Sequence, residues 1–595
     1  MSFLKTNYKL ILTTVAAVAF LLVCDILFEE QFADENQLFR EFTEQLFCME
    51  TAANTVSLHY TLKEPESYGI SDADVTFGTF PTDSKEMLVS LENIQNALDQ
   101  FAFEELSLDN QLTYEILDYY VENGMEGAEY LLYEEPLGTV GGVQTQVPIV
   151  LSEYQFYDKN DVDTYLELMQ TTPEYFESLI EFEKEKAEAG LFMSDHAADL
   201  VLEQCTSFVG LGEANYLYST FADRVTMVDE LSEQEKSDYI QKNASMMEEY
   251  LIPAYNALIE AVQELKGSGK NEGGLCGFAE GRDYYEHMVQ NLVGTERTVE
   301  EMVNLTRQQI MDDLDSMEAI MKQQTGQAYD AAEMMSSAVY AQETASMEDS
   351  NPVMILNTLE DQIAKTFPAA PKTTVNVKYV PENMEEYMSP AFYMIPAIDN
   401  YEENVIYVNR AQMGNSLVLF TTLAHEGYPG HLYQTTYFAG TDADPIRNSF
   451  HFGGYVEGWA TYAEMCSYYL TPYAKEQATL FQKYNSIMLG IYTLADIGIH
   501  YEGWDREDTL QFFTLYGIKD AEVVDDIYDL IIGCPGNYLQ YYIGYVEFME
   551  LKKQWALEKG DAFSQTEFHK AVLDVGPAPF EIVEKYMWEN IVYSY

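Results

Sequence analysis

The segment at residues 425–431 reads HEGYPGH and constrains the fold of this chain more than any other segment. Residues 414–424, just before it, are mostly apolar and predict a helix. His431 follows His425 by six residues, or about 600° of helical rotation, so on a regular helix the two rings would point about 120° apart. Pro429 cannot donate a helical hydrogen bond, and Gly430 permits unusual backbone angles. The Pro-Gly pair therefore predicts a bulge of two residues that brings His431 back over His425.

Two imidazoles beside a carboxylate are the groups that a catalytic zinc site uses. Imidazole is a frequent zinc ligand, and a glutamate next to it, here Glu426, can act as general base toward a water that the metal activates. Residues 456–464 read VEGWATYAE and predict an apolar, aromatic helix with two glutamates on one face. Glu457 is the predicted third ligand to a single Zn²⁺ ion, and Glu464 is predicted to accept a hydrogen bond from a ligand imidazole. His451, in a polar turn, is the competing ligand.

Length and charge limit the classes of protein to which the chain can belong. With 595 residues it is too long for one simple core and predicts two or more lobes. A hydrophobic content of 47% provides enough material for those cores. The 100 acidic residues against 31 basic ones give a net charge of −69, which excludes nucleic acid as a partner and argues against docking on anionic lipid.

The amino end carries a targeting signal. Residues 10–24 are apolar, and Lys5 and Lys9 precede them, so residues 1–28 predict a signal sequence or a membrane anchor whose basic end stays in the cytoplasm. Lipidation at Cys24 is the alternative, although Val23 is bulkier than the residue that usually precedes a lipidated cysteine. The body of the chain is therefore expected outside the cytoplasmic membrane, which it contacts only through this segment.

The body divides into a helical lobe at 29–290 and a second lobe at 291–595 that carries the motifs. Amphipathic helices dominate both lobes, with a Gly-rich connection at 136–150 and a loop at 266–285. Alternating or β-branched stretches predict a small sheet before the motif helix, with strands at 373–380, 392–397 and 404–409. The predicted fold class is thus mainly α with a small β-sheet. The sequence neither predicts nor excludes a disulfide between Cys205 and Cys276.

The two motifs together resemble a large bacterial family long labelled a domain of unknown function, which is placed among the gluzincin-type zinc peptidases. The similarity extends from about residue 35 to 592. The segment Glu457-Gly-Trp-Ala is also similar to the helix of zinc aminopeptidases whose glutamate is the third ligand. Further matches lie at 407–409, 535–544 and 567–573.

The resemblance implies a two-lobed, zincin-like helical metallopeptidase with the zinc in a deep cleft. In the related oligopeptidases and carboxypeptidases a tyrosine, sometimes with a histidine, stabilises the oxyanion. By motif position Tyr541 is expected in that role, with Tyr542 as the alternative and His569 as a helper. The strand that ends at Asn409 is expected to pair with the backbone of a substrate.

A carboxypeptidase would also need a cation for the substrate carboxylate. The scarce basic residues near the motifs that could supply it are Arg282, Arg410 and Arg447. In the loop at 266–285, Arg282 could contact substrate together with Tyr284 or Tyr285.

These residues predict an extracytoplasmic zinc peptidase that acts on oligopeptides. In this mechanism Glu426 moves the proton from water to the leaving amine, and Tyr541 donates to the oxyanion. A metal-dependent amidase or esterase would use the same ligands. The third alternative is a surface binding protein with a structural metal, against which the adjacent base Glu426 argues. Neither the cleavage position nor the oligomeric state is predicted.

Overall fold

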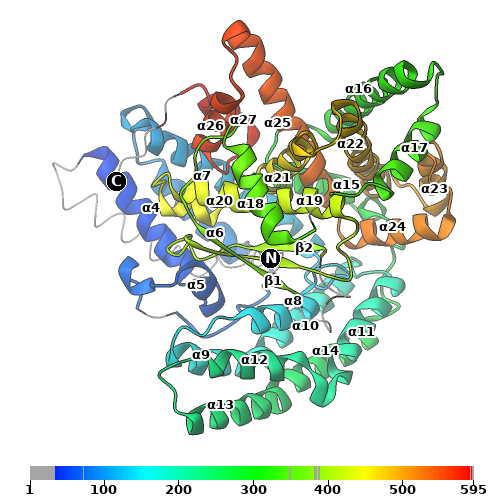
Figure 1. Cartoon of the computed structure of the whole chain (residues 1–595). Coiled ribbons are helices and arrows are strands. Elements are labelled where there is room, and N and C mark those ends of the chain that lie inside the picture. Colours follow the sequence, from blue (N-terminus) through cyan, green and yellow to red (C-terminus); the bar gives the residue numbers. More distant parts are fainter. Residues whose placement is uncertain are drawn as a thin grey trace. The chain divides into compact units, whose positions relative to one another are not determined.

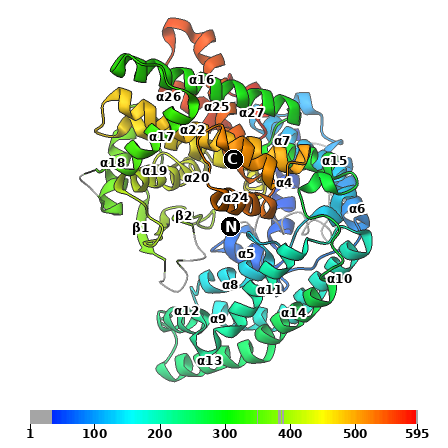
Figure 2. The ribbon, with the colours of Figure 1, turned by 90° about the vertical axis from the view of Figure 1, so that its right-hand side faces the viewer.

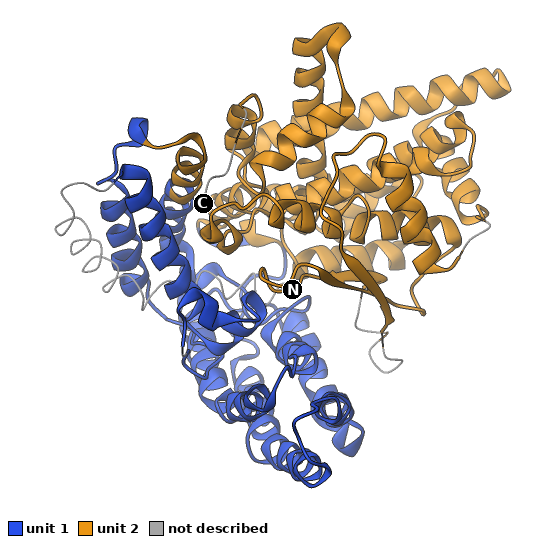
Figure 3. Cartoon of the chain, turned by 60° about the vertical axis from the view of Figure 1, so that its left-hand side comes forward, with its two compact units in different colours: residues 1–105, 118–273, 277–279 blue, residues 106–117, 274–276, 280–595 orange. Residues whose placement is uncertain are grey.

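The computed structural model describes residues 34–591 except 72, 348–349, 381–384, 386–388 and 590. The predicted signal or anchor at 1–28, including Cys24, lies outside this range. The chain forms two compact units, one made of residues 1–105, 118–273 and 277–279, the other of residues 106–117, 274–276 and 280–595 (Figure 3). The second unit thus begins at Glu280 rather than at the predicted residue 291, and it takes in two short earlier segments.

The first unit is entirely helical within its described residues. Buried side chains between Val56 and Val262 pack into a core of aliphatic and aromatic residues, and α9, α12 and α13 lie side by side at one end (Figures 1 and 2). The helix α7 (Leu108–Gly127) begins in the second unit and continues in the first. The other helices of the first unit are α4 (Glu35–Thr51), α5 (Thr55–Thr61), α6 (Lys85–Leu98), α8 (Val143–Glu153), α9 (Lys159–Gln170), α10 (Thr172–Ala189), α11 (Asp195–Gly210), α12 (Tyr216–Thr226), α13 (Glu233–Met246) and α14 (Ile252–Leu265).

The predicted connection at 136–150 is wrong in its second half, which is the start of α8. Val143, Val147, Val150 and Leu151 follow a helical spacing and are all buried in the core of the unit. Burial of these four side chains stabilises the helix by more than Pro148 destabilises it. The local sequence alone gives too much weight to the proline.

The second unit packs a helical core over a small sheet. The helices α21, α22 and α25 are mutual neighbours at its centre, and α19 lies between α21 and the strand β2 (Figure 1). The helices are α15 (Gly281–Val293), α16 (Val299–Thr325), α17 (Ala331–Glu343), α18 (Pro352–Ile363), α19 (Ser416–Glu426), α20 (His431–Ala439), α21 (Gly453–Ser467), α22 (Lys475–Ile497), α23 (Arg506–Thr514), α24 (Ala521–Gly533), α25 (Asn537–Lys559), α26 (Gln565–Val575) and α27 (Phe580–Tyr586). The mainly helical class with a small sheet is confirmed.

The three predicted strands are present as β1 (Thr374–Tyr379), β2 (Ala391–Met394) and β3 (Glu403–Val408). Their order is β1-β3-β2, with β1 parallel and β2 antiparallel to β3. Because β3 is paired on both sides, it has no free edge, and the expectation that it pairs with a substrate is wrong. The edge strand that contacts α19 is β2.

The helices α21 and α25 cross with their backbones in contact. A Cβ atom at Gly544 would lie 2.1 Å from the carbonyl oxygen of Gly454, and one at Gly458 would lie 2.3 Å from the carbonyl carbon of Gly544. Three glycines at the crossing therefore set the distance between the two helices. This close approach matters because α21 carries Glu457 and α25 carries Tyr541.

A buried carboxylate holds the start of α25. Both oxygens of Asp496, on α22, accept from the amide of Gly536 at 3.0 Å, and Oδ1 accepts from the hydroxyl of Tyr285 at 2.7 Å. Tyr285 is fully buried, so it ties α15 to this network and cannot contact a substrate as proposed above. Burial raises the pKa of Asp496 to about 7, and its hydrogen bonds with Tyr285 and Gly536 oppose the shift.

This shift predicts a pH dependence of stability. Between the unfolded-state pKa near 3.8 and the folded-state value near 7, the folded protein binds the extra proton, so the free energy of unfolding falls as pH rises through this window. Asp496→Asn mimics the protonated form, so its free energy of unfolding lacks this fall with pH. The stability difference between variant and wild type should therefore move in favour of the variant by up to about 4 kcal/mol from pH 4 to pH 7. Denaturant unfolding at several pH values measures it, and a constant difference would contradict the assignment.

Two further observations concern cysteines and membrane spans. Cys205 and Cys276 are both free thiols, so the disulfide left open above is not formed. Among the described residues, no helix is both long enough and apolar enough to span a bilayer.

Candidate metal centre

The two histidines of the first motif lie on two successive helices, α19 and α20. The amide of Gly430 donates to the carbonyl oxygen of Ala424 at 2.9 Å, and the amide of Tyr433 donates to that of Gly427 at 3.1 Å. Both bonds span six residues instead of the four of an α-helix, so two residues are looped out, as the sequence predicts. A Cβ atom at Gly430 would lie 1.8 Å from the carbonyl oxygen of His425, so only glycine fits there.

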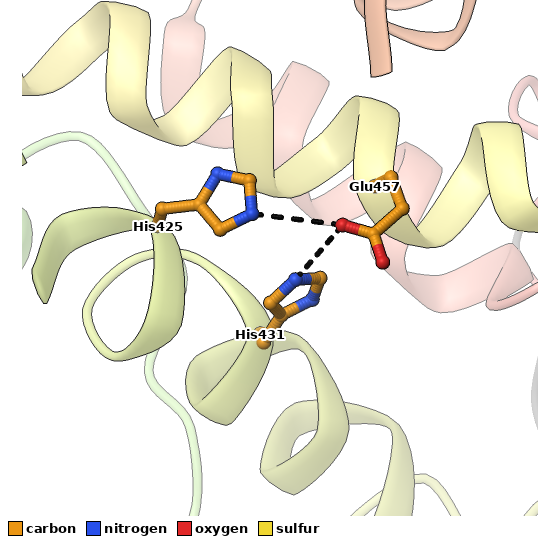
Figure 4. Close-up of side chains that lie close together, drawn as sticks. All are labelled: His425, His431 and Glu457. Carbon is orange, nitrogen blue, oxygen red and sulfur yellow. Dashed lines mark ion pairs between the residues drawn. The ribbon is translucent and has the colours of Figure 1, made fainter. Parts of the chain in front are cut away.

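The bulge brings both imidazoles to face Glu457 of α21 (Figure 4). Nε2 of His431 lies 3.1 Å from Oε2 of Glu457, and Nε2 of His425 lies 3.6 Å from the same oxygen. One donor atom from each of the three residues lies within 4.8 Å of the others. Among the described residues, this is the one group of three or more His, Cys, Asp or Glu side chains with that geometry. His451 is not a member.

The three donors fit a divalent metal ion. Zinc lies about 2.0–2.2 Å from nitrogen and oxygen ligands, so the edge of a tetrahedral site is about 3.3–3.6 Å. The two nitrogen-to-oxygen separations lie close to that edge. Two imidazoles and one carboxylate are also the donor set of catalytic zinc sites with an open fourth position. His425 is 9% and Glu457 is 7% exposed, so the donors lie away from bulk solvent.

A further carboxylate, Glu464, orients this group. Oε2 of Glu464, two turns along α21 from Glu457, lies 3.3 Å from Nδ1 of His425, the ring nitrogen on the far side from the ligand atom. This contact selects the orientation of the His425 ring. Burial lowers the pKa of His425, but the carboxylates of Glu457 and Glu464 outweigh burial and hold it well above the ordinary value.

Glu426, next to His425, is held by the edge strand β2. Its Oε2 accepts from the backbone amide of Tyr393 at 2.8 Å, a contact that sequence reasoning missed because nothing local marks that amide. Burial raises the pKa of Glu426, and the imidazoles of His431 and His425 partly oppose the shift. A carboxylate with a raised pKa accepts a proton more readily than an ordinary one, which suits a general base.

Tyr541 reaches the same group from α25. Its ring lies parallel to that of His425, with centroids 6.0 Å apart and planes at 20°. The negative charge of Glu457 is the main reason that the pKa of Tyr541 is raised well above its ordinary value, and burial adds to it. Tyr541 therefore keeps its hydroxyl proton and can donate it in a hydrogen bond.

The second motif also holds the bulge of the first. The indole Nε1 of Trp459 donates to the carbonyl oxygen of Pro429 at 2.9 Å, and the ring is fully buried. Phe367 packs edge-on against it at 6.1 Å. The tryptophan in VEGWATYAE thus anchors the looped-out residue between the two histidines, a role that the sequence did not indicate.

Removing this donor should weaken metal binding as well as folding. In Trp459→Phe the carbonyl of Pro429 loses its buried partner, which costs about 1–3 kcal/mol. Because the bulge positions His431, we expect the affinity for zinc to fall about tenfold or more. Competition with a chromophoric chelator measures this, with thermal unfolding of the metal-free protein in parallel. Unchanged zinc affinity in a folded variant would contradict this role.

Two residues expected in catalysis lie in the core instead. His569 is fully buried, with Nε2 bonded to the hydroxyl of Tyr462 at 2.8 Å and Nδ1 to the carbonyl of Thr366 at 2.8 Å. Burial lowers its pKa to about 3, so it stays neutral and has no ring nitrogen left for a substrate. Tyr542 is also fully buried, because it lies about 100° round α25 from Tyr541 and faces α22.

The residues expected to bind substrate also have structural partners. Arg447 is 1% exposed and donates to the carbonyls of Val575 and Pro577 at the end of α26. Asn409 is fully buried, and its side chain donates to the carbonyl of Glu385. Both expectations are wrong because burial was not readable from the sequence.

The other two basic residues of that set lie at the surface. Arg282 is exposed and donates to the carbonyl of Tyr501 at 2.8 Å. Arg410 is exposed and lies over the ring of Tyr379 at 3.8 Å. Neither residue has a contact with the three metal-binding side chains.

Two solved structures have a similar fold. A protein from Colwellia psychrerythraea, described as a putative lipoprotein, superposes with a TM-score of 0.80 at 16% identity over 93% of this chain and 99% of its own. A protein from Shewanella oneidensis, described as a putative lipoprotein of unknown function, gives a TM-score of 0.66 at 16% identity over 92% and 100%. At this identity the likeness concerns the fold alone. No curated protein matches the chain.

A family model covers most of the sequence. The model of DUF885, described as a bacterial protein of unknown function, matches residues 69–587. That range includes the three candidate metal ligands, Glu426 and Tyr541. The chain therefore belongs to the DUF885 family.

Proposed function

We propose that this protein is an extracytoplasmic zinc-dependent peptidase that hydrolyses oligopeptides. The observation that carries the proposal is the convergence of His425, His431 and Glu457, with one donor atom from each within 4.8 Å, beside the half-buried carboxylate of Glu426. A purely structural metal site closes all four positions with protein ligands and needs no adjacent base. The arrangement therefore favours catalysis at a gluzincin-type centre.

Each residue has a distinct task in this mechanism. A bound zinc ion would supply the positive charge that polarises the scissile carbonyl and the attacking water. Glu426 takes the proton from that water and passes it to the leaving amine. The hydroxyl of Tyr541 donates to the oxygen that becomes negative as the carbonyl is attacked. Glu464 keeps the ring of His425 in one orientation.

The outer edge of β2 is the part of the sheet best placed to pair with an extended substrate. In the antiparallel pairing of β2 with β3, Phe392 and Met394 face their partners Tyr407 and Val405, while the amide of Tyr393 points away and meets Glu426. The outer edge of β2 therefore lies next to the base. A peptide that added to this edge would place its backbone beside Glu426.

The location outside the cytoplasm rests on two independent supports. The apolar segment at residues 10–24, after Lys5 and Lys9, is typical of an export signal or anchor. The two proteins of similar fold are described as putative lipoproteins. Both agree with a body that acts at the cell surface.

Peptide profiling with and without a chelator tests the function. The protein lacking residues 1–28, incubated with a peptide library and analysed by mass spectrometry, should release products. Chelation should remove the activity, and added zinc should restore it. Cleavage that survives removal of all metal would contradict the proposal. Bound zinc without turnover of any peptide would favour an amidase, an esterase or a binding protein.

A further inference from the structure

A row of aromatic rings leads away from the metal centre along α25. Tyr538 precedes Tyr541 by one helical turn, so both side chains lie on the same face of the helix. The ring of Tyr541 is parallel to that of His425, and the ring of Tyr538 stacks on Tyr492 of α22, with centroids 4.8 Å apart and planes at 16°. Two nearly parallel ring pairs, one turn apart, therefore begin at the metal-binding histidine.

The stacked pair rests on a rigid base. Behind Tyr492 lies Phe513 of α23, with centroids 5.7 Å apart, and Phe513 is fully buried. The hydroxyl of Thr493, next to Tyr492, donates to the backbone carbonyl of Tyr538 at 3.2 Å. This bond joins the two helices at the level of the pair. The rings are thus held in place before any ligand arrives, which lowers the entropic cost of binding.

Core packing alone does not account for this pair. Phe513 fills the core position, whereas Tyr492, Tyr538 and Tyr541 all stay half-buried, between the fully buried residues and the surface. The partly exposed pair of Tyr492 and Tyr538 thus lies one helical turn from Tyr541, whose ring lies against that of His425. Such aromatic rings bind apolar groups with little loss of conformational freedom.

We propose that Tyr492 and Tyr538 form an aromatic subsite that binds a large apolar or aromatic side chain of the substrate next to the scissile bond. The proposal rests on the proposed function, because it takes Tyr541 and His425 as the place where the bond is cleaved.

Matched peptides test the subsite. Cleavage sites in the library should be enriched in Phe, Tyr or Leu on one side, and two peptides that differ only in Phe or Ala at that position give a discrimination ratio of kcat/KM. Tyr492→Leu and Tyr538→Leu should each lower this ratio up to about tenfold. Tyr492→Phe and Tyr538→Phe should keep the wild-type ratio, because phenylalanine retains the aromatic ring. Tyr340→Leu, at a 68% exposed tyrosine of α17, is the control and should leave the ratio unchanged.

A binding measurement separates failure of this subsite from failure of the proposed function. The zinc-loaded Glu426→Gln protein and the two peptides, labelled for fluorescence anisotropy, give a Kd ratio that needs no turnover. If wild type cleaves nothing, the peptidase assignment fails, yet a Kd ratio that the leucine variants abolish still supports the subsite. Equal kcat/KM and equal Kd for the Phe and Ala peptides would overturn it, as would leucine variants that fold and keep the wild-type ratios.

Discussion

Replacing Glu426 with Gln is expected to lower kcat/KM for peptide hydrolysis by about 10²–10⁴-fold. The amide keeps the size of the side chain and can still accept from the backbone amide of Tyr393, but it cannot take a proton from water. Zinc content should stay at the wild-type level, because Glu426 is not one of the three donors. Hydrolysis of a library-derived peptide and metal analysis of the same preparation measure both quantities.

Two further glutamine variants provide the matched controls. Glu457→Gln removes the charge of a ligand and should lose zinc itself. Glu464→Gln leaves the ligands in place and should lower zinc affinity by about 10–100-fold, the usual effect of removing a carboxylate that orients a ligand imidazole. Full activity in Glu426→Gln would eliminate it as the base. Loss of zinc in Glu426→Gln would instead show that Glu426 is a metal ligand.

Replacing Gly544 with Ala is expected to have the largest effect on stability. The added methyl would lie 2.1 Å from the carbonyl oxygen of Gly454, which belongs to the backbone of α21 and cannot rotate away. The two helices must separate, at a cost of about 3 kcal/mol or more. Because α21 carries Glu457 and α25 carries Tyr541, the same movement should weaken zinc binding. Denaturant unfolding and zinc titration measure the two effects.

Gly210→Ala is the control for a glycine-to-alanine change in a helix. Gly210 is exposed at the end of α11, and a Cβ atom there would meet nothing within 4 Å. This variant should be as stable as wild type or more stable by up to about 1 kcal/mol. If Gly544→Ala were equally harmless, the backbone contact would not set the distance between α21 and α25.

The grouping of the three candidate metal ligands was predictable because its determinants are local or periodic. The Pro-Gly pair between His425 and His431 requires an interrupted helix, and the looped-out residues follow from covalent geometry. The seven-residue spacing of Glu457 and Glu464 places both on one face of α21, and the structure brings both to His425. Alternating or β-branched stretches likewise predicted the three strands.

Predictions that depended on long-range burial failed. Arg447 was selected as a scarce cation, yet it lies in the interior and donates to carbonyls at the end of α26. Tyr541 and Tyr542 are adjacent and chemically identical. Tyr541 meets His425 and Tyr542 does not, because only one face of α25 is turned toward His425. A single sequence does not show which face of the helix that is.

The sequence by itself thus determined the helical class, the bulged motif and the candidate donor set of His425, His431 and Glu457, since helical period and backbone restrictions act between near neighbours. Only the tertiary structure decided that β3 is the central strand, so that the outer edge of β2 lies beside Glu426. It also decided that Trp459 holds Pro429 and that glycines of α21 and α25 set the position of Tyr541. These contacts join segments far apart in the chain, and the packing of whole helices, not any local pattern, brings them together.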